Sequence, residues 1–356
     1  MTFFRPPEIE EIRRQARKIT DEQKQQNILR TKLQRDPGND LFLIKPADQW
    51  LKEEYSKPPA RQLLGSLWYE HELCILFADT NIGKSILAVQ IGYNLGKQSS
   101  IEPFGNHLDE PVNVLYIDFE LTAGQFKARY SHPAYGVHHF GGHFIRAEFN
   151  PAGDNPLLYE NYEEYVRQWI ESSIRQTKAK VLIIDNITYL GIATGNAGSA
   201  LPLMKSLKAI KTKYKLSVLV LAHTPKRSLY KPITVNDLQG SKMLINFADS
   251  AFALGQSYAN SGLRYLKQIK QRNTASNYGT NNVCLFKLTK QLSFLSFEFS
   301  GYDTEQAHLQ KVATSLSDEV KQQIMELTQQ GLSQRQVANH LKVSCSTVSR
   351  VVNKRK

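Results

Sequence analysis

Apolar and polar positions follow two different periods through the middle of this chain. Apolar runs that are typical of strands occupy residues 73–77, 112–119, 181–184 and 216–222. Between these runs, apolar residues recur at helical spacing over residues 84–97, 157–176 and 199–214. Strands separated by helices predict βαβ units, in which parallel strands form a sheet that helices cover on both faces.

Three later apolar runs follow one another without helices between them. They cover residues 263–269, 283–288 and 292–299. Because strands so close in sequence pair most simply as antiparallel neighbours, we expect them to close one edge of the sheet. The prediction for residues 61–300 is therefore an α/β domain with a mostly parallel sheet flanked by helices.

Polar segments bound this domain on both sides. Residues 1–60 mix positive and negative charges, and residues 8–34 have the pattern of a solvated helix that docks on a neighbour. Residues 301–316 are polar and predict a linker. A separate C-terminal domain is then expected over residues 317–356.

The C-terminal pattern predicts a small all-α domain. A first helix is expected over residues 318–330, and Gly331 ends it. Ser333 and Gln336 have the spacing of a capping box, which begins a second helix. After a tight turn, residues 344–354 continue as a third helix. Two short helices joined by a tight turn predict a helix-turn-helix.

Composition narrows the choice of compartment and partner. Of the 356 residues, 45 are Lys or Arg and 33 are Asp or Glu, so that the net charge is +12. This excess favours an acidic polymer as partner, and nucleic acid is the leading case. The cysteines lie far apart, no apolar run has the length of a membrane span, and residues 1–7 do not resemble a signal peptide. We therefore expect a cytoplasmic protein without a membrane partner.

The most informative motif lies between the first strand and the first helix. It reads Ala78, Asp79, Thr80, Asn81, Ile82, Gly83, Lys84 and Ser85, and the helix continues with Ile86. A strand, a loop ending in Gly-Lys-Ser and a helix form the layout of a P-loop, whose backbone N–H groups face nucleotide phosphates. Lys84 is expected to reach the β- and γ-phosphates, and the Ser85 hydroxyl to hold Mg²⁺. Ala78 stands where the pattern has glycine, a difference that can alter nucleotide affinity.

Two strands that end in carboxylates supply the acidic groups that ATP hydrolysis needs. The third strand ends at Asp185, which we predict to hold Mg²⁺ together with Ser85. Asn186 follows Asp185, so no acid adjoins it there. Glu120, at the tip of the second strand, is predicted to activate the attacking water, and Asp118 is the alternative.

A histidine ends the fourth strand. Because the carboxyl ends of parallel strands meet at one edge of a sheet, His223 is placed to contact the γ-phosphate and to report its state to the following loop.

Together these motifs resemble the RecA-like ATPases, in particular the hexameric helicases of the plasmid RepA type and their DnaB-like relatives. The resemblance covers about residues 62–300. It rests on the Gly-Lys-Ser motif, Glu120, Asp185, His223, and residues 238–242 and 247–254. It implies ATP and Mg²⁺ as cofactors, Glu120 as the catalytic carboxylate, His223 as a sensor, and a homo-oligomer, most simply a hexamer.

The resemblance also implies contacts with single-stranded DNA. In RecA-like proteins a mobile loop after the sensor touches DNA; here that segment is residues 224–239, with Lys226, Arg227 and Lys231. A second such loop would lie within residues 189–200, which hold no Lys or Arg, so its role stays open.

A basic pair late in the domain is the candidate for contact between subunits. Related ring helicases present such a pair to the ATP of the neighbouring subunit, and Lys270 and Arg272 have the alternate spacing that would point both to one side of a strand. The competing interpretation is a solvated edge strand that uses lysine against aggregation.

The helix-turn-helix resembles those of transposases, resolvases and sigma-like regulators. Its second helix would offer to the major groove of duplex DNA the residues Ser346, Thr347, Ser349, Arg350 and Asn353. Residues 318–356 hold seven Lys or Arg against three Asp or Glu, which favours DNA binding. The alternative is a helical hairpin that packs on the ATPase or on a partner.

The sequence therefore predicts a Mg²⁺-dependent ATPase that acts on DNA, most simply a ring-forming replicative helicase or motor of a plasmid or mobile element. Two alternatives use the same nucleotide site and stay open. One is an ATP-switched, site-specific DNA-binding regulator of replication, transposition or transcription that does not unwind DNA. The other is a recombinase-like filament protein.

Overall fold

The computed structural model describes residues 18, 20–24, 43–150, 162–190, 197–239, 241–310 and 318–353. The chain divides between Pro59 and Ala60 into two units. The first unit contains helix α2 (Ala47–Tyr55). Of the helix expected over residues 8–34, Lys18 and Thr20–Lys24 are described and helical, and the rest lies outside the described residues.

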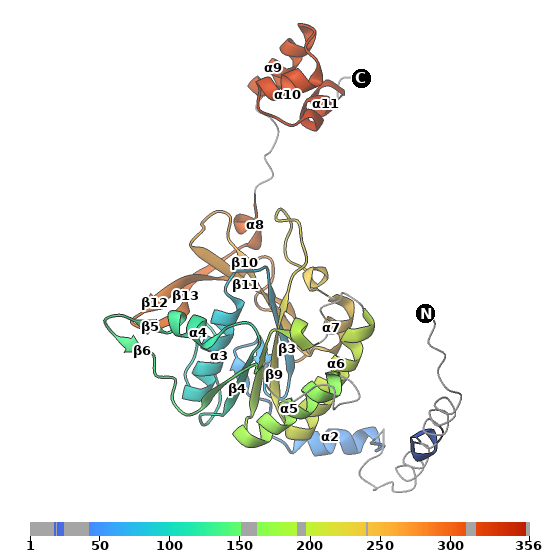
Figure 1. Ribbon diagram of the computed structural model, residues 1–356, viewed down its shortest axis with the longest axis vertical. Coiled ribbons are helices and arrows are strands. Elements are labelled where there is room, and N and C mark those ends of the chain that lie inside the picture. Colours follow the sequence, from blue (N-terminus) through green and yellow to red (C-terminus); the bar gives the residue numbers. More distant parts are fainter. Residues whose placement is uncertain are drawn as a thin grey trace, which may run out of the picture. The chain divides into compact units, whose positions relative to one another are not determined.

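A nine-stranded sheet forms the centre of the second unit, with the order β13-β12-β11-β10-β3-β9-β8-β4-β7 (Figure 1). Six neighbouring strands are parallel: β10 (Ser250–Gln256), β3 (Leu73–Ala78), β9 (Ser217–His223), β8 (Val181–Asp185), β4 (Val114–Asp118) and β7 (Phe144–Glu148). Three antiparallel strands complete one side: β11 (Leu263–Lys270), β12 (Val283–Gln291) and β13 (Phe294–Asp303). The mostly parallel sheet and its antiparallel edge are both as the sequence predicts.

Two parallel strands were not expected from the apolar pattern. β7 carries Arg146 and Glu148 and lies at the edge of the sheet, where one side of a strand is not covered by a neighbour. β10 is built largely from small residues, and a Cβ at Gly255 would lie 2.2 Å from the ring of Tyr265. A strand that must let a neighbouring aromatic ring approach so closely lacks the bulky side chains that mark a strand in sequence.

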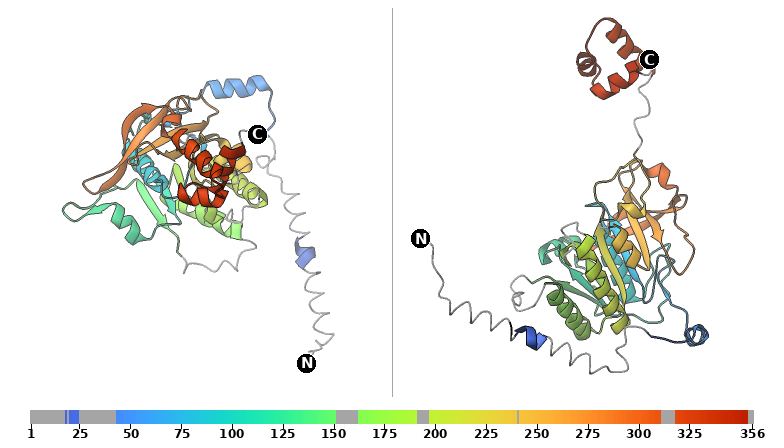
Figure 2. Two further views of the ribbon diagram at one scale, coloured as in Figure 1. Left: turned by 90° about the horizontal axis from the view of Figure 1, so that it is seen from above. Right: turned by 90° about the vertical axis from the view of Figure 1, so that its right-hand side faces the viewer.

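Helices cover both faces of the sheet. On one face α5 (Tyr162–Thr177), α6 (Ala197–Tyr214) and α7 (Ser241–Phe247) bury apolar side chains, and Figures 1 and 2 show α5 and α6 running along it. The other face packs against α3 (Lys84–Lys97) and the hairpin of β1 (Gln62–Leu64) and β2 (Trp68–Tyr69). All six residues of β3 are buried, because alternate side chains enter the two cores. In the described part of the chain no helix is long and apolar enough to cross a membrane.

Shorter elements lie in the connections between the main strands and helices. They are α4 (Ala123–Arg129), the hairpin of β5 (Ser131–His132) and β6 (Gly136–Val137), and the 3-10 turns η2 (Ile187–Leu190) and η3 (Val235–Asp237). The capping box of Thr122 and Gln125 begins α4, so a polar pair fixes where the chain turns away from β4.

The linker begins later than expected. Residues 301–303 belong to β13, and α8 (Glu305–His308) follows with Glu305 fully buried. Gln310 donates its N–H to the carbonyl of Leu229 at 3.1 Å. Residues 301–310 are therefore part of the α/β fold, which corrects the predicted linker over 301–316; residues 311–316 lie outside the described residues.

Three helices form the C-terminal domain. They are α9 (Asp318–Gln329), α10 (Gln334–His340) and α11 (Cys345–Asn353), and they share a core of Ile324, Val337, Ala338 and Val348. The capping box of Ser333 and Gln336 is present as predicted. Gly331 ends the first helix with φ of 86°, a value that glycine adopts without strain.

Candidate functional site

The carboxyl ends of four neighbouring strands meet at one edge of the sheet. The register pairs Ala78 of β3 with His223 of β9, and Asp118 of β4 with Asp185 of β8. β9 joins the two pairs, because it lies between β3 and β8. This strand order brings the P-loop, Asp185, Glu120 and His223 together, although they are widely separated in sequence.

The P-loop turns sharply before α3. Asn81 has φ of 63° and Gly83 has φ of 108°. A Cβ at Gly83 would lie 2.7 Å from Cζ of Phe297, so glycine is needed here both for its backbone angle and for the space. Thr80 is exposed, whereas Ile86 is buried in the core beneath α3, so Ile86 can offer a nucleotide only its backbone N–H.

A chain of polar contacts crosses the strand ends. Lys84 Nζ lies 3.0 Å from His223 Nδ1, and His223 Nε2 lies 3.4 Å from Glu120 Oε1. Asn186 Nδ2 donates to the same Glu120 oxygen at 2.7 Å. The histidine tautomer that carries its proton on Nε2 satisfies both neighbours, because Nδ1 then accepts from Lys84 and Nε2 donates to Glu120.

The hydrogen bonds from His223 and Asn186 lower the pKa of Glu120, with His223 the larger cause. Glu120 is therefore ionised at neutral pH, as a proton acceptor must be. Burial lowers the pKa of Lys84, and the charges of Asp185 and Glu120 oppose that shift.

Asp118 has a different environment. One carboxylate oxygen accepts the N–H groups of Glu120 at 3.1 Å and Leu121 at 2.9 Å, and the other accepts from Arg146 Nε at 2.9 Å. Oδ1 of this buried group therefore holds the turn that carries Glu120, and Oδ2 pairs with Arg146, which in turn donates to the Leu121 carbonyl. The sequence left open which of the two acids activates water. In the structure Glu120 is accessible to a reacting group, whereas Asp118 is engaged in holding the turn.

Asp185 is fully buried beside the start of α3. Burial raises its pKa to about 6, and the hydroxyls of Ser85 and Tyr116 act in the opposite direction. The Tyr116 hydroxyl donates to Oδ2, whereas Oδ1 has no hydrogen-bond partner in the described part of the chain. A buried carboxylate oxygen without a partner, next to a serine hydroxyl, fits a divalent cation such as Mg²⁺. The described residues contain no cluster of three or more His, Cys, Asp or Glu side chains suited to a metal, so nucleotide phosphates would have to complete the coordination.

The loop over residues 224–239 is tied to the P-loop. Asp79 accepts a hydrogen bond from the Thr224 hydroxyl and lies 3.3 Å from Arg227 Nε. The Arg227 side chain is 3% exposed, so it faces inward, contrary to its expected place on a DNA-contacting surface. Lys226 and Lys231 are exposed.

Lys270 and Arg272 lie at the opposite end of the sheet from the P-loop of their own chain. Lys270 pairs in register with Ala251 near the start of β10, whereas Ala78 pairs with Leu254 near its end. β11 ends at Lys270, so Arg272 follows the strand, which corrects the expectation that both occupy alternate positions on it.

Both cations nevertheless converge on the end of α7. Lys270 Nζ donates to the carbonyls of Ile245 at 2.6 Å and Ala248 at 2.8 Å, and Arg272 Nη2 donates to that of Asn246 at 3.0 Å. Positive groups at a helix C-terminus are stabilised by its free carbonyls.

Sequence reasoning missed several residues that shape this site. Asn186 was noted only because it is not an acid, yet it holds Glu120. Tyr116 looked like any apolar strand position, and only its hydroxyl distinguishes it. Arg264, the second residue of β11, donates to the Ile82 carbonyl of the P-loop at 3.3 Å. No local pattern marks these contacts, because each joins segments that are distant in sequence.

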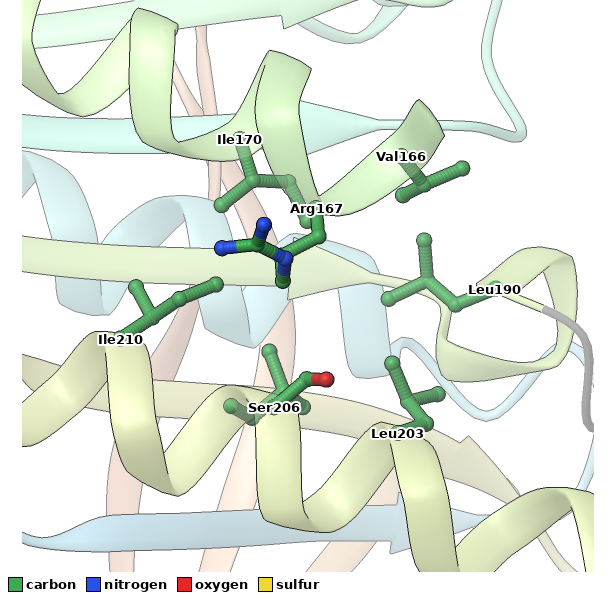
Figure 3. Close-up of a pocket in the computed structure, with 8 residues that line it drawn as sticks. Val166, Arg167, Ile170, Leu190, Leu203, Ser206 and Ile210 are labelled. Atoms are coloured by element: carbon green, nitrogen blue, oxygen red, sulfur yellow. The ribbon is translucent and has the colours of Figure 1, made fainter. Parts of the chain in front are cut away.

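A small crevice lies between α5 and α6 (Figure 3). Its lining is mostly apolar, with Arg167 and Ser206 beside Val166, Ile170, Leu190, Leu203, Leu207 and Ile210. Arg167 is already paired with Glu164 and Glu171. Because Arg167 is already paired, the crevice offers no group suited to binding a phosphate, and we assign no function to it.

The predicted DNA-facing helix is α11. Ser346, Arg350 and Asn353 are exposed, and Thr347 and Ser349 are half-buried. The Ser344 hydroxyl accepts the Thr347 N–H at 3.2 Å and so begins the helix, and Asn353 donates to Ser349 at 3.2 Å.

Comparison with known proteins adds two family matches. Residues 43–228, more than half of the chain, match a family model described as an AAA domain. Residues 313–355 match one described as a helix-turn-helix domain. A search of curated proteins finds no match. Among solved structures, a KaiC-like protein from Pyrococcus horikoshii OT3 is similar, with 14% identity, a TM-score of 0.47, and coverage of 67% of this chain and 99% of that one. The expected fold, a mostly parallel sheet flanked by helices and followed by a helix-turn-helix domain, is confirmed.

Proposed function

This chain belongs to the AAA domain family, and on that premise we propose that it hydrolyses ATP with Mg²⁺ and acts on DNA. The observation that carries the proposal is the meeting of Lys84, Glu120, Asp185 and His223 at one sheet edge beside the P-loop. In this proposal the ATPase domain extends from residue 61 to residue 310, and the DNA-binding domain occupies residues 317–356.

The P-loop would hold the nucleotide. The N–H groups of residues 79–86 bind phosphate oxygens, and Lys84 turns its ammonium from His223 towards the β- and γ-phosphates. Ser85 and Asp185 would hold Mg²⁺, which supplies neutralisation of the charge on the transferring phosphoryl group. Burial of Lys84 and Asp185 strengthens these interactions, because little water competes with them.

Glu120 would accept the proton of the attacking water. Asn186 orients its carboxylate, and the turn held by Asp118 positions its backbone. His223 contacts Lys84 and Glu120, so a γ-phosphate that attracts Lys84 would change both of its contacts. This arrangement supports His223 as the sensor of nucleotide state.

We further propose that active sites are completed between subunits of a ring, most simply a hexamer. Lys270 and Arg272 are too far along the sheet to serve the P-loop of their own chain, since they lie at its opposite end. Contact with the ATP of a neighbouring subunit would give them a role in stabilising the transferred phosphoryl group.

The DNA contacts would be divided between two surfaces. Lys226 and Lys231 suit single-stranded DNA beside the ATP site, and α11 suits the major groove of a duplex. Both surfaces would serve a ring-forming helicase or motor of a plasmid or mobile element. The helix-turn-helix match also favours a second candidate, an ATP-switched regulator that binds one duplex sequence without unwinding it.

One set of measurements tests the proposal. The ATPase rate is measured without DNA, with single-stranded DNA and with duplex DNA, alongside strand displacement on tailed duplexes and particle mass with and without ATP. A helicase shows stimulation by single strands, strand displacement and a ring-sized mass. Slow hydrolysis with tight binding to one duplex sequence indicates the regulator. Absence of ATP binding would refute both.

A further inference from the structure

We infer that Tyr116 is a positioning residue for the metal site, because its hydroxyl holds the Asp185 carboxylate in the orientation that leaves one oxygen free for a cation. The inference rests on the proposed function, since it concerns the site that would hold Mg²⁺ during ATP hydrolysis. It adds a residue that no sequence motif marks.

Tyr116 reaches Asp185 along the sheet. It pairs in register with Ile183, two residues before the pair formed by Asp118 and Asp185. Alternate residues of a strand share a face, so Tyr116 and Asp185 lie on the face that α3 covers. From there the phenol hydroxyl donates to Asp185 Oδ2.

The phenol has little freedom to move. Tyr116 is fully buried, and its ring centroid lies 5.8 Å from that of Phe144. A donor fixed in this way also fixes the plane of the carboxylate that accepts from it. Asp185 Oδ1, which has no hydrogen-bond partner among the described residues, is then held in one direction. The Ser85 hydroxyl lies close enough to the same carboxylate to lower its pKa.

The surroundings of Tyr116 argue against a purely packing role. Its neighbours in the core beneath α3 are apolar, and a phenylalanine would fill the same space. A buried hydroxyl in such surroundings costs free energy unless it is hydrogen-bonded. Its partner here is the one carboxylate that the site offers to a metal, and groups that orient metal ligands typically contribute about 10–100-fold to metal affinity or activity.

The core contains a matched control. Tyr130 is also buried, in the same cluster, but its hydroxyl has no partner among the described residues. Tyr116→Phe and Tyr130→Phe therefore remove the same atom from similar surroundings, and only the first removes a bond to Asp185. Leaving Asp185 Oδ2 unpaired lowers the free energy of unfolding by an amount that a folded domain usually tolerates.

The test measures metal binding directly. Mn²⁺ stands in for Mg²⁺, and electron paramagnetic resonance of free Mn²⁺ reports its affinity for the protein saturated with ADP. We expect Tyr116→Phe to weaken Mn²⁺ binding by about 10-fold or more, as for other groups that orient metal ligands. Tyr130→Phe should match the unaltered protein, and ADP binding in the presence of a chelator should be the same in all three.

A double-mutant cycle provides the second measurement. In an Asp185→Asn background the carboxylate that Tyr116 orients is gone, so adding Tyr116→Phe should weaken Mn²⁺ binding no further. Equal weakening in both backgrounds, or unchanged Mn²⁺ affinity in Tyr116→Phe, would overturn the inference while leaving the ATPase proposal intact. Failure of the unaltered protein to bind ADP with Mn²⁺ would instead count against the proposed function.

Discussion

Glu120 and Asp118 are two residues apart, yet their surroundings separate their roles. Asp118 is buried and gives both oxygens to backbone N–H groups and to Arg146. Glu120 is partly exposed and receives hydrogen bonds from Asn186 and His223. At the scale of the residue, then, the same functional group supports a turn in one position and is left partly exposed beside the P-loop lysine and His223 in the other.

This difference predicts opposite outcomes for two conservative changes. Glu120→Gln should bind ATP normally and lose about 10²–10⁴-fold in turnover, because it keeps the shape and removes the proton acceptor. Asp118→Asn should lower stability, because it removes the charge of a fully buried carboxylate and leaves the half-buried Arg146 guanidinium only the exposed Glu148 as an ion-pair partner. ATP binding, steady-state turnover and urea unfolding of both variants check this. Normal turnover in Glu120→Gln, with turnover lost in a stably folded Asp118→Asn, would identify Asp118 as the base.

At the scale of the element, α8 joins parts of the fold that are distant in sequence. Glu305 accepts the Ile233 N–H at 2.6 Å and pairs with Lys267 Nζ at 2.5 Å. Lys267 in turn donates to the Ile233 carbonyl at 2.6 Å. This short helix therefore clamps the loop over residues 224–239 against β11.

Breaking the buried pair should be costly. Glu305→Gln leaves the Lys267 ammonium uncompensated, and removal of one partner of a buried ion pair typically costs about 3–5 kcal/mol. Glu298→Gln, an exposed change on the neighbouring β13, is the control and should change stability by less than about 0.5 kcal/mol. Equilibrium urea unfolding measures both. Equal stability of the two variants would show that α8 is not a structural clamp.

At the scale of the whole molecule, the positions of two cationic side chains bear on how subunits would assemble. Lys84 lies at one end of the sheet, and Arg272 follows β11 at the other. If the two ends meet between subunits, a defect at each end affects a different half of the same site.

Mixed assemblies test this division. Lys84→Ala and Arg272→Ala should each be folded and inactive, the first because the phosphates lose their cation. Mixing the two should restore part of the ATPase activity, since some interfaces then carry both intact halves. Activity is measured against mixing ratio, with each variant alone as control. Full activity of the unaltered chain as a dilute monomer would refute the shared site.

The helix-turn-helix domain leads to a separate prediction. Arg350 is exposed on α11, and Arg350→Ala should weaken binding to the preferred duplex by about 1–3 kcal/mol if it contacts a guanine edge. A phosphate contact would instead weaken all sequences alike and lower the salt dependence. The ATPase rate without DNA should not change. Fluorescence anisotropy at several salt concentrations distinguishes these cases; duplex binding that survives deletion of residues 316–356 would assign it elsewhere.

Much of the fold follows from local signals in the chain. The apolar runs predict most strands, and the helix expected over residues 84–97 is α3 with the same bounds. The capping box of Ser333 and Gln336 also forms as expected. Such features depend on neighbours a few residues away, whose energies the order of side chains specifies directly.

Contacts between distant segments depended on the tertiary structure. That β9 lies between β3 and β8 decides that His223 stands between Lys84 and Glu120. The inward turn of Arg227 and the burial of α8 likewise have no local signal. The sequence by itself determined which groups stand at strand ends, because periodicity records burial along one element. Only the packed sheet decided which of them touch, since pairing between strands is set by the energy of the whole core.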